Sequence, residues 1–146
     1  MLLSELVDGL ADYEKLPRPT PEARERLRSD AFGAQPRIRV YLASIAERAV
    51  GYALTCDSYS SFLARPTLYL EDLFVLPEHR RHGVGRAFFR YLADEALRLG
   101  YGRMDWAVLD WNRSAIDFYQ KLGATHISDW QIYRLTTEQL QEVAHG

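Results

Sequence analysis

The chain places two carboxylates and a basic, glycine-containing turn close together along one segment. Glu71 and Asp72 interrupt an apolar run, residues 68–76, that has the character of a buried strand. The turn follows as Arg80-x-x-Gly83-x-Gly85, and the residues after it have the spacing of an amphipathic helix. Glycines let the backbone approach a ligand closely, and the amides at a helix N-terminus attract anions. This order predicts a polyphosphate site near a pair of acidic side chains.

Two other kinds of phosphate loop do not fit this turn. A dinucleotide-binding fingerprint needs a further glycine three residues after Gly85, where Phe88 stands. A Walker loop needs Lys and then Ser or Thr after its last glycine, and this chain has Arg86 and Ala87. Because an ordinary tight turn has the same composition, the functional interpretation depends on a second group of residues.

That second group lies over residues 106–124 and also has the pattern strand, loop, helix. Asn112 and Ser114 are N-cap candidates, and Gly123 is a natural C-terminal stop. Tyr119 falls on the apolar stripe of the predicted helix. Its phenol stays protonated at neutral pH, so Tyr119 is either a proton donor or a core residue.

The two segments together resemble the GNAT superfamily of acyl-CoA-dependent N-acetyltransferases. Tyr-Leu-Glu-Asp-Leu-Phe-Val (69–75), Trp-Asn-x-x-Ala-Ile-x-Phe-Tyr (111–119) and Lys-x-Gly-Ala (121–124) resemble its spermidine/spermine, or diamine, branch. The resemblance implies an α/β (α+β) fold with a central mixed, mostly antiparallel sheet and helices on both faces. It also implies acetyl-CoA as co-substrate and a homodimer with its sites near the subunit interface.

The resemblance also implies roles for individual residues. Glu71 corresponds to the base that takes the proton of the attacking ammonium, whose ordinary pKa is about 10.4. Tyr119 corresponds to the acid that protonates the departing coenzyme thiolate. Asn112 corresponds to a contact with the pantetheine arm, a role compatible with that of a simple N-cap. Coenzyme binding by the strand end and the turn is implied for Phe74, Val75, Arg80, Arg81, His82, Gly83, Val84, Gly85 and Arg86.

The acceptor is less well defined by these residues. Side chains alternate along a strand, so Glu71 and Asp72 are expected on opposite faces of the sheet unless a bulge intervenes. Asp72 is then an acceptor-orienting or structural residue. A polar loop is predicted over residues 57–66, and in relatives this position shapes the amine pocket, which makes Asp57 and Tyr59 candidate substrate-binding residues. A small monoamine, a diamine or a lysine-like amino acid fits at least as well as a long polyamine.

The bulk properties exclude several classes of protein. The length of 146 residues predicts one domain over residues 1–146, and the net charge of −2 argues against nucleic-acid binding. The sequence shows neither a membrane-length apolar run nor a secretory signal, so a cytoplasmic protein without membrane contact is expected. The four histidines lack metal-ligand spacing, so no metal is predicted. Cys56, the single cysteine, is expected in a strand as a small apolar residue.

The remaining elements follow from periodicity and capping residues. A first helix should end before Pro17, and a second, capped by Thr20, should end near Gly33. Trp106 and Trp130 are expected in the core. Relatives begin with a strand before the first helix, so the first edge strand is expected to be absent or to lie upstream. Further strands are expected over residues 38–43, 50–56, 104–109 and around 131–135, with a last helix capped by Thr136.

These inferences predict an acetyl-CoA-dependent N-acetyltransferase that acts on a small cationic amine by direct attack in a ternary complex. One alternative is an acetyltransferase that modifies protein lysines or N-termini. Another is an acyl-CoA-binding sensor or partner module without catalysis. The presence of both Glu71 and Tyr119 argues against the sensor, because binding alone needs neither.

Overall fold

The computed structural model describes residues 2–146, which form two compact units. The first unit ends at Leu109 and the second begins at Asp110, and each is described by itself. The first contains α1 (Leu2–Glu14), α2 (Pro21–Phe32), β1 (Arg39–Ile45), β2 (Arg48–Ser60), β3 (Arg65–Val75), the 3-10 turn η1 (Pro77–His79), α3 (Val84–Leu99) and β4 (Arg103–Trp106). The second contains α4 (Arg113–Leu122) and α5 (Thr137–His145).

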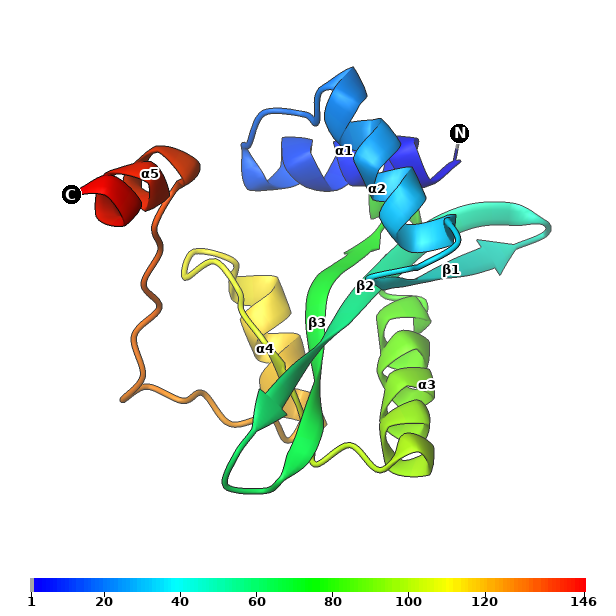
Figure 1. The fold of residues 1–146 in the computed structure, drawn as a ribbon. Helices are drawn as coiled ribbons and strands as arrows, with labels where there is room; N and C mark the ends of the chain where they lie inside the picture. Colours follow the sequence, from blue (N-terminus) through cyan, green and yellow to red (C-terminus); the bar gives the residue numbers. More distant parts are fainter. Residues whose placement is uncertain (1) are drawn as a thin grey trace. The chain divides into compact units, whose positions relative to one another are not determined.

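The first unit is built on a four-stranded sheet in the order β1-β2-β3-β4. Figure 1 labels β1, β2 and β3 of this sheet. The pairs β1–β2 and β2–β3 are antiparallel, whereas β4 joins β3 in parallel. This arrangement confirms the predicted mixed, mostly antiparallel sheet. In the described residues α1 begins at Leu2 and no strand precedes it, so β1 forms one edge of the sheet.

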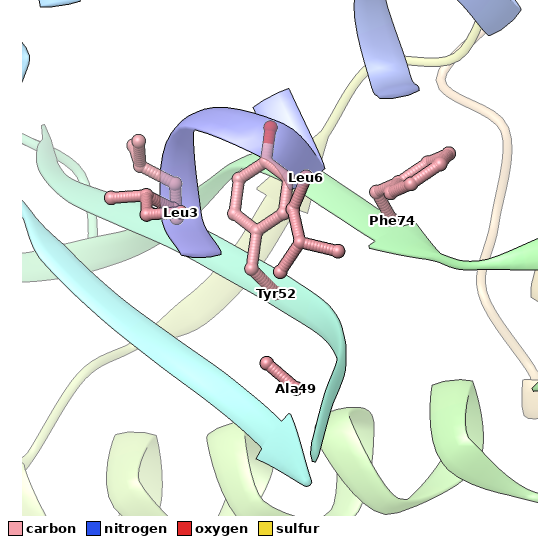
Figure 2. Close-up of a cluster of buried hydrophobic side chains, with 6 residues drawn as sticks. Leu3, Leu6, Ala49, Tyr52 and Phe74 are labelled. Atoms are coloured by element: carbon pink, nitrogen blue, oxygen red, sulfur yellow. The ribbon is translucent and has the colours of Figure 1, made fainter. Parts of the chain in front are cut away.

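Helices cover both faces of this sheet. On one face, Leu3 and Leu6 of α1 pack against Tyr52 of β2 and Phe74 of β3, and Figure 2 shows the Tyr52 ring standing between α1 and the sheet. On the other face, α3 buries a stripe of four residues, Phe88, Phe89, Leu92 and Ala96. The Phe89 ring meets Trp106 edge-on with centroids 5.0 Å apart, but Trp106, which was expected in the core, is only half-buried.

The predicted helix ends are confirmed by the capping contacts. Thr20 accepts a hydrogen bond from the Ala23 amide, and Thr136 forms a capping box with Gln139. Gly123 ends α4 in the left-handed conformation with φ of 93°. Among the described helices, none is both long and apolar enough to cross a membrane.

Two expectations for the second unit are wrong. The predicted strand around residues 131–135 has no strand partner in the structure and forms no ladder. Trp130, expected in the core, is 78% exposed. Alternating apolar residues favour an extended backbone, but a strand also needs a neighbour to satisfy its amides and carbonyls. The sequence pattern shows the first requirement and not the second.

Candidate functional site

A β-bulge lies at the two neighbouring carboxylates. Leu54 of β2 pairs with Asp72, but the next residue, Thr55, pairs with Leu70, so Glu71 is the extra residue of β3. Asp72 opposite Leu54 therefore lies on the same face as Phe74 opposite Tyr52, which is the face covered by α1. The bulge that would set aside the expected alternation of Glu71 and Asp72 is therefore present at Glu71.

Three carboxylates gather at this bulge. The charges of Glu71 and Glu14, the last residue of α1, both raise the pKa of Asp72. Burial and the charge of Glu71 likewise raise the pKa of Glu14. Glu71 itself is exposed, whereas Asp72 and Glu14 are half-buried. The end of α1 and the bulge of β3 thus create an acidic cluster, Glu14, Glu71 and Asp72, which attracts cations.

Tyr52 links this acidic cluster to the core. Its hydroxyl donates a hydrogen bond of 3.0 Å to Asp72 Oδ2. Burial raises the pKa of Asp72 to about 6, the neighbouring carboxylates add to this, and the Tyr52 hydrogen bond opposes it. Burial and the Asp72 charge raise the pKa of the Tyr52 hydroxyl, so it remains a donor. A carboxylate with a pKa near 6 is suited to exchange protons at neutral pH.

The raised pKa of Asp72 makes a prediction about stability. Its pKa of about 6 in the folded protein exceeds the ordinary 3.8, so the folded state holds this proton more tightly than the unfolded chain. The resulting stabilisation is complete below pH 4 and is lost as the pH rises through about 6. Asp72→Asn should therefore raise the free energy of unfolding by about 1 to 3 kcal/mol at pH 7 and change it little at pH 4.

Urea unfolding at the two pH values measures this difference. Asp94→Asn, at an exposed position of α3, is the matched control and should change neither value. If Asp72→Asn destabilised the protein at pH 7, the buried charge would not be the dominant effect at this position.

Asp57 and Tyr59 lie in a strand and not in the predicted loop. The strand β2 continues to Ser60, which pairs with Arg65, and only residues 61–64 form the turn. The polar side chains are compatible with a strand because this end of the hairpin is largely exposed. The Asp57 carboxylate accepts hydrogen bonds of 2.6 Å from Arg39 and 2.6 Å from the Tyr101 hydroxyl, so it is already engaged within the fold.

The strand β3 has an open edge directly after the bulge. Its pairing with β4 ends at Leu70, opposite Trp106, and β3 continues to Val75. The Leu76 amide bonds to Val50 on β2, and successive residues of a strand direct their amides to opposite edges. The amide of Val75 therefore faces the open edge, as does that of Leu73, whereas the amide of Phe74 faces β2. The open edge offers unpaired donors at Leu73 and Val75.

The Arg80 side chain is engaged in the packing of α1 against β3. Its Nε donates a hydrogen bond of 2.8 Å to the Val75 carbonyl. Its guanidinium lies over the rings of Tyr13 and Phe74, at 4.8 Å and 5.4 Å from their centroids. The Arg80 side chain is thus held against Val75, Tyr13 and Phe74.

The rest of the turn has the features of an anion site. Gly83 caps α3 with φ of 84°, and no side chain caps the first amides of the helix. Arg81, His82 and Arg86 are exposed, and the N-terminus of α3 continues through Val84 and Gly85. Arg81 has φ of 64°, a left-handed conformation that glycine adopts most readily. Free amides, helix dipole and arginines together fit a pyrophosphate.

The second unit holds the two remaining predicted site residues. Tyr119 lies on α4, its ring 5.8 Å from that of Phe118. The Asn112 side chain accepts a hydrogen bond of 3.4 Å from the Ala115 amide, so Asn112 is the N-cap of α4. The described residues contain no group of His, Cys, Asp and Glu side chains able to hold a metal ion.

Sequence reasoning missed Glu14 and Tyr52. Glu14 lies 57 positions before Glu71, and only the packing of α1 on β3 connects them. The sequence does contain a signal for Tyr52, because a tyrosine within the buried apolar run of β2 carries a hydroxyl that needs a hydrogen-bond partner. Its position opposite Phe74 follows from the sheet register, which the sequence does not show.

Comparison with known proteins identifies the family. The model of the acetyltransferase (GNAT) family matches residues 4–124. Bovine thialysine N-epsilon-acetyltransferase is 37% identical over 150 residues, covering 95% of this chain and 88% of that protein. L-ornithine N5-acetyltransferase NATA1 of Arabidopsis thaliana is 41% identical over 93 residues, which are 64% of this chain and 41% of that protein.

Solved structures share the fold. An integron cassette protein from the mobile metagenome of V. cholerae superimposes with a TM-score of 0.82 at 22% identity, over 99% of this chain and 90% of its own. A probable acetyltransferase gives a TM-score of 0.80 at 21% identity, over 92% and 89% of the two chains. With the family match and the relatives above, this chain belongs to the GNAT acetyltransferase family and is an N-acetyltransferase.

Proposed function

We propose that this protein transfers the acetyl group of acetyl-CoA to a primary amine of a small acceptor that carries a second positive charge. The observation that carries this proposal is the acidic cluster of Glu14, Glu71 and Asp72 beside the open edge of β3. Three carboxylates near one another repel each other, and a cationic ligand relieves that repulsion. The acidic cluster therefore suits a polyvalent amine better than a neutral or monovalent one.

The names of the relatives favour one class within this group. Thialysine and ornithine, the acceptors in the names of two relatives, are both amino acids with a side-chain primary amine. A relative with 27% identity, from Homo sapiens, is named for spermidine and spermine. We therefore propose lysine-like diamino acids as the preferred acceptors, and diamines and polyamines as the second class of acceptor.

The chain supplies binding and proton transfer for this reaction. Bound acetyl-CoA supplies the acetyl group and a thiol leaving group. The amides at the N-terminus of α3 and the arginines of the turn would hold the pyrophosphate. The Leu73 and Val75 amides would bond the pantetheine arm along the open edge. By the resemblance to relatives, Asn112 is a further candidate contact for this arm.

Two proton transfers complete the role of the chain. Glu71, which is exposed at the bulge, would take the ammonium proton directly or through water and pass it to solvent. Asp72 would orient the acceptor beside it. Tyr119 would donate the proton that the departing thiolate needs.

A covalent acetyl-cysteine step is not part of this proposal. Burial and the carboxylates of Glu71 and Asp57 raise the pKa of the half-buried Cys56 thiol, which lowers its thiolate fraction. Cys56→Ala should therefore retain kcat within about twofold, because direct transfer does not use the thiol. Steady-state kinetics with varied concentrations of both substrates measure this, and a loss of kcat of about 100-fold or more would support a covalent relay.

We also propose that the protein is a homodimer. The second unit exposes four large apolar side chains in one extended segment: Trp130, Ile132, Tyr133 and Leu135. Such a segment is compatible with a subunit contact. Light scattering coupled to size exclusion should give twice the chain mass of 16.9 kDa, and a single chain mass at micromolar concentration would contradict the proposal.

Release of coenzyme thiol from acetyl-CoA across a panel of amines tests the proposed function. The panel contains thialysine, ornithine, lysine, putrescine, spermidine and a lysine-containing peptide. Saturable turnover with a small cationic amine is expected. Turnover with the peptide alone would favour a protein-modifying enzyme, and coenzyme binding without turnover would favour a sensor.

A further inference from the structure

The Tyr52 hydroxyl is the single polar side-chain group among the buried members of an apolar cluster, against which the half-buried Tyr13 also packs. Tyr52 is fully buried at 0% exposure, and its cluster partners are Leu3, Leu6, Ala49, Leu54 and Phe74. A phenylalanine would fill the same ring volume. The hydroxyl has one function in this environment, which is the hydrogen bond of 3.0 Å to Asp72 Oδ2.

The sheet register fixes this contact. Tyr52 pairs with Phe74, and Asp72 lies two residues before Phe74 on the same face, so Tyr52 and Asp72 are diagonal neighbours. The pairing is regular from Asp72 to Phe74, and the bulge at Glu71 lies just before it. Core packing of the ring between α1 and the sheet holds the hydroxyl in place, as Figure 2 shows for the labelled side chains.

We propose that Tyr52 is a positioning residue for acetyl transfer, whose hydroxyl holds the Asp72 side chain in its charged form beside Glu71 and Glu14. The groups that act on Asp72 come from each element around it: Tyr52 from β2, Glu71 from β3 and Glu14 from α1. Among the described residues that act on the Asp72 charge there is no cation, and both carboxylates favour its protonation. The hydrogen bond from Tyr52 is the one contact that favours the anion.

This inference rests on the proposed function, because the charged Asp72 matters for binding a cationic acceptor. Without the hydroxyl, a larger fraction of Asp72 would be protonated near neutral pH, and the acidic cluster would be less negative. The acceptor would then bind less tightly, while the transfer step through Glu71 and Tyr119 would change little. Raising the pH would restore the charge and with it the affinity.

Tyr52→Phe tests this reasoning by its pH dependence. At pH 6.5 the variant should show about threefold lower kcat/KM for the acceptor, through KM and not kcat, because the charged fraction of Asp72 falls by that factor when its pKa rises by about one unit. At pH 8.5, where Asp72 is charged in both proteins, the two values should agree. Tyr91→Phe is the matched control, because it removes a tyrosine hydroxyl that bonds a carboxylate, Glu95, on the exposed face of α3. The control should show an unchanged profile.

A titration of the aspartate carboxyl groups by carbon-13 NMR separates this inference from the proposed function. Asp72 should titrate near pH 6 in the parent protein and about one pH unit higher in Tyr52→Phe, whether or not any amine is acetylated. If no amine in the panel were acetylated, the proposed function would be wrong, but the titration would still test the effect of Tyr52 on Asp72. An unchanged Asp72 titration, or an equal loss of kcat/KM at both pH values, would overturn the role of Tyr52.

A double variant tests whether Tyr52 acts through Asp72 or through a general effect on the structure. In the Asp72→Asn background, Tyr52→Phe should cause no further change in the pH profile, because the group that it acts through no longer titrates. If the second substitution still lowered kcat/KM about threefold at pH 6.5 alone, the hydroxyl would act elsewhere.

Discussion

Glu71→Gln should lower kcat/KM for the amine acceptor by about 100- to 1000-fold. Glutamine keeps the size and the position in the bulge of β3 but can neither accept a proton nor attract the ammonium group. The first loss slows proton removal, and the second weakens binding of the acceptor to the acidic cluster. Initial rates of thiol release over a range of acceptor concentrations measure both effects.

The control for this substitution is Glu25→Gln, an exposed carboxylate on α2 outside the acidic cluster. It should keep the activity of the parent protein. If Glu71→Gln kept its rate while Asp72→Asn lost about 100-fold, the proton acceptor would be Asp72, whose pKa of about 6 also suits that role.

Tyr119→Phe should lower kcat by about 100-fold or more and leave the dissociation constant of acetyl-CoA nearly unchanged. The substitution removes the proton that the thiolate takes on departure, whereas the phenyl ring preserves the packing on α4. Single-turnover measurements isolate the transfer step, and isothermal titration gives the dissociation constant of the coenzyme.

A chemical test strengthens this assignment. If the missing proton limits the Tyr119→Phe variant, acyl donors with a more acidic thiol should recover much of the lost rate, since a better leaving group needs less protonation. Tyr91→Phe again serves as the control hydroxyl on α3. A variant with full kcat on acetyl-CoA would show that Tyr119 is a packing residue.

Local sequence signals predicted most of the fold. Capping residues such as Thr20 and Thr136 and the stop at Gly123 mark helix ends, because they act within one turn of the chain. The apolar run of β3 and the turn before α3 were likewise evident. The segment around residues 131–135 was not predictable in the same way, since a strand depends on a partner that the local sequence does not specify.

Only part of the site was predictable from the sequence, because the rest depends on contacts between residues that are far apart along the chain. The motif around Glu71 shows both carboxylates, but the bulge at Glu71 is a property of the pairing register with β2, which the sequence does not show. Glu14 joins the acidic cluster only through the packing of α1. Long-range packing also directs the Arg80 side chain to Tyr13, away from the turn to which its sequence position assigns it.

The most direct test of the account compares acceptors that differ in one positive charge. Thiol release from acetyl-CoA would be measured with ornithine and putrescine and with butylamine, a primary amine that lacks a second cationic group. The acidic cluster predicts a kcat/KM at least about tenfold higher for the acceptors with the second ammonium group, and a difference that shrinks in Asp72→Asn. Equal or better turnover of butylamine would contradict an acceptor site built on Glu14, Glu71 and Asp72.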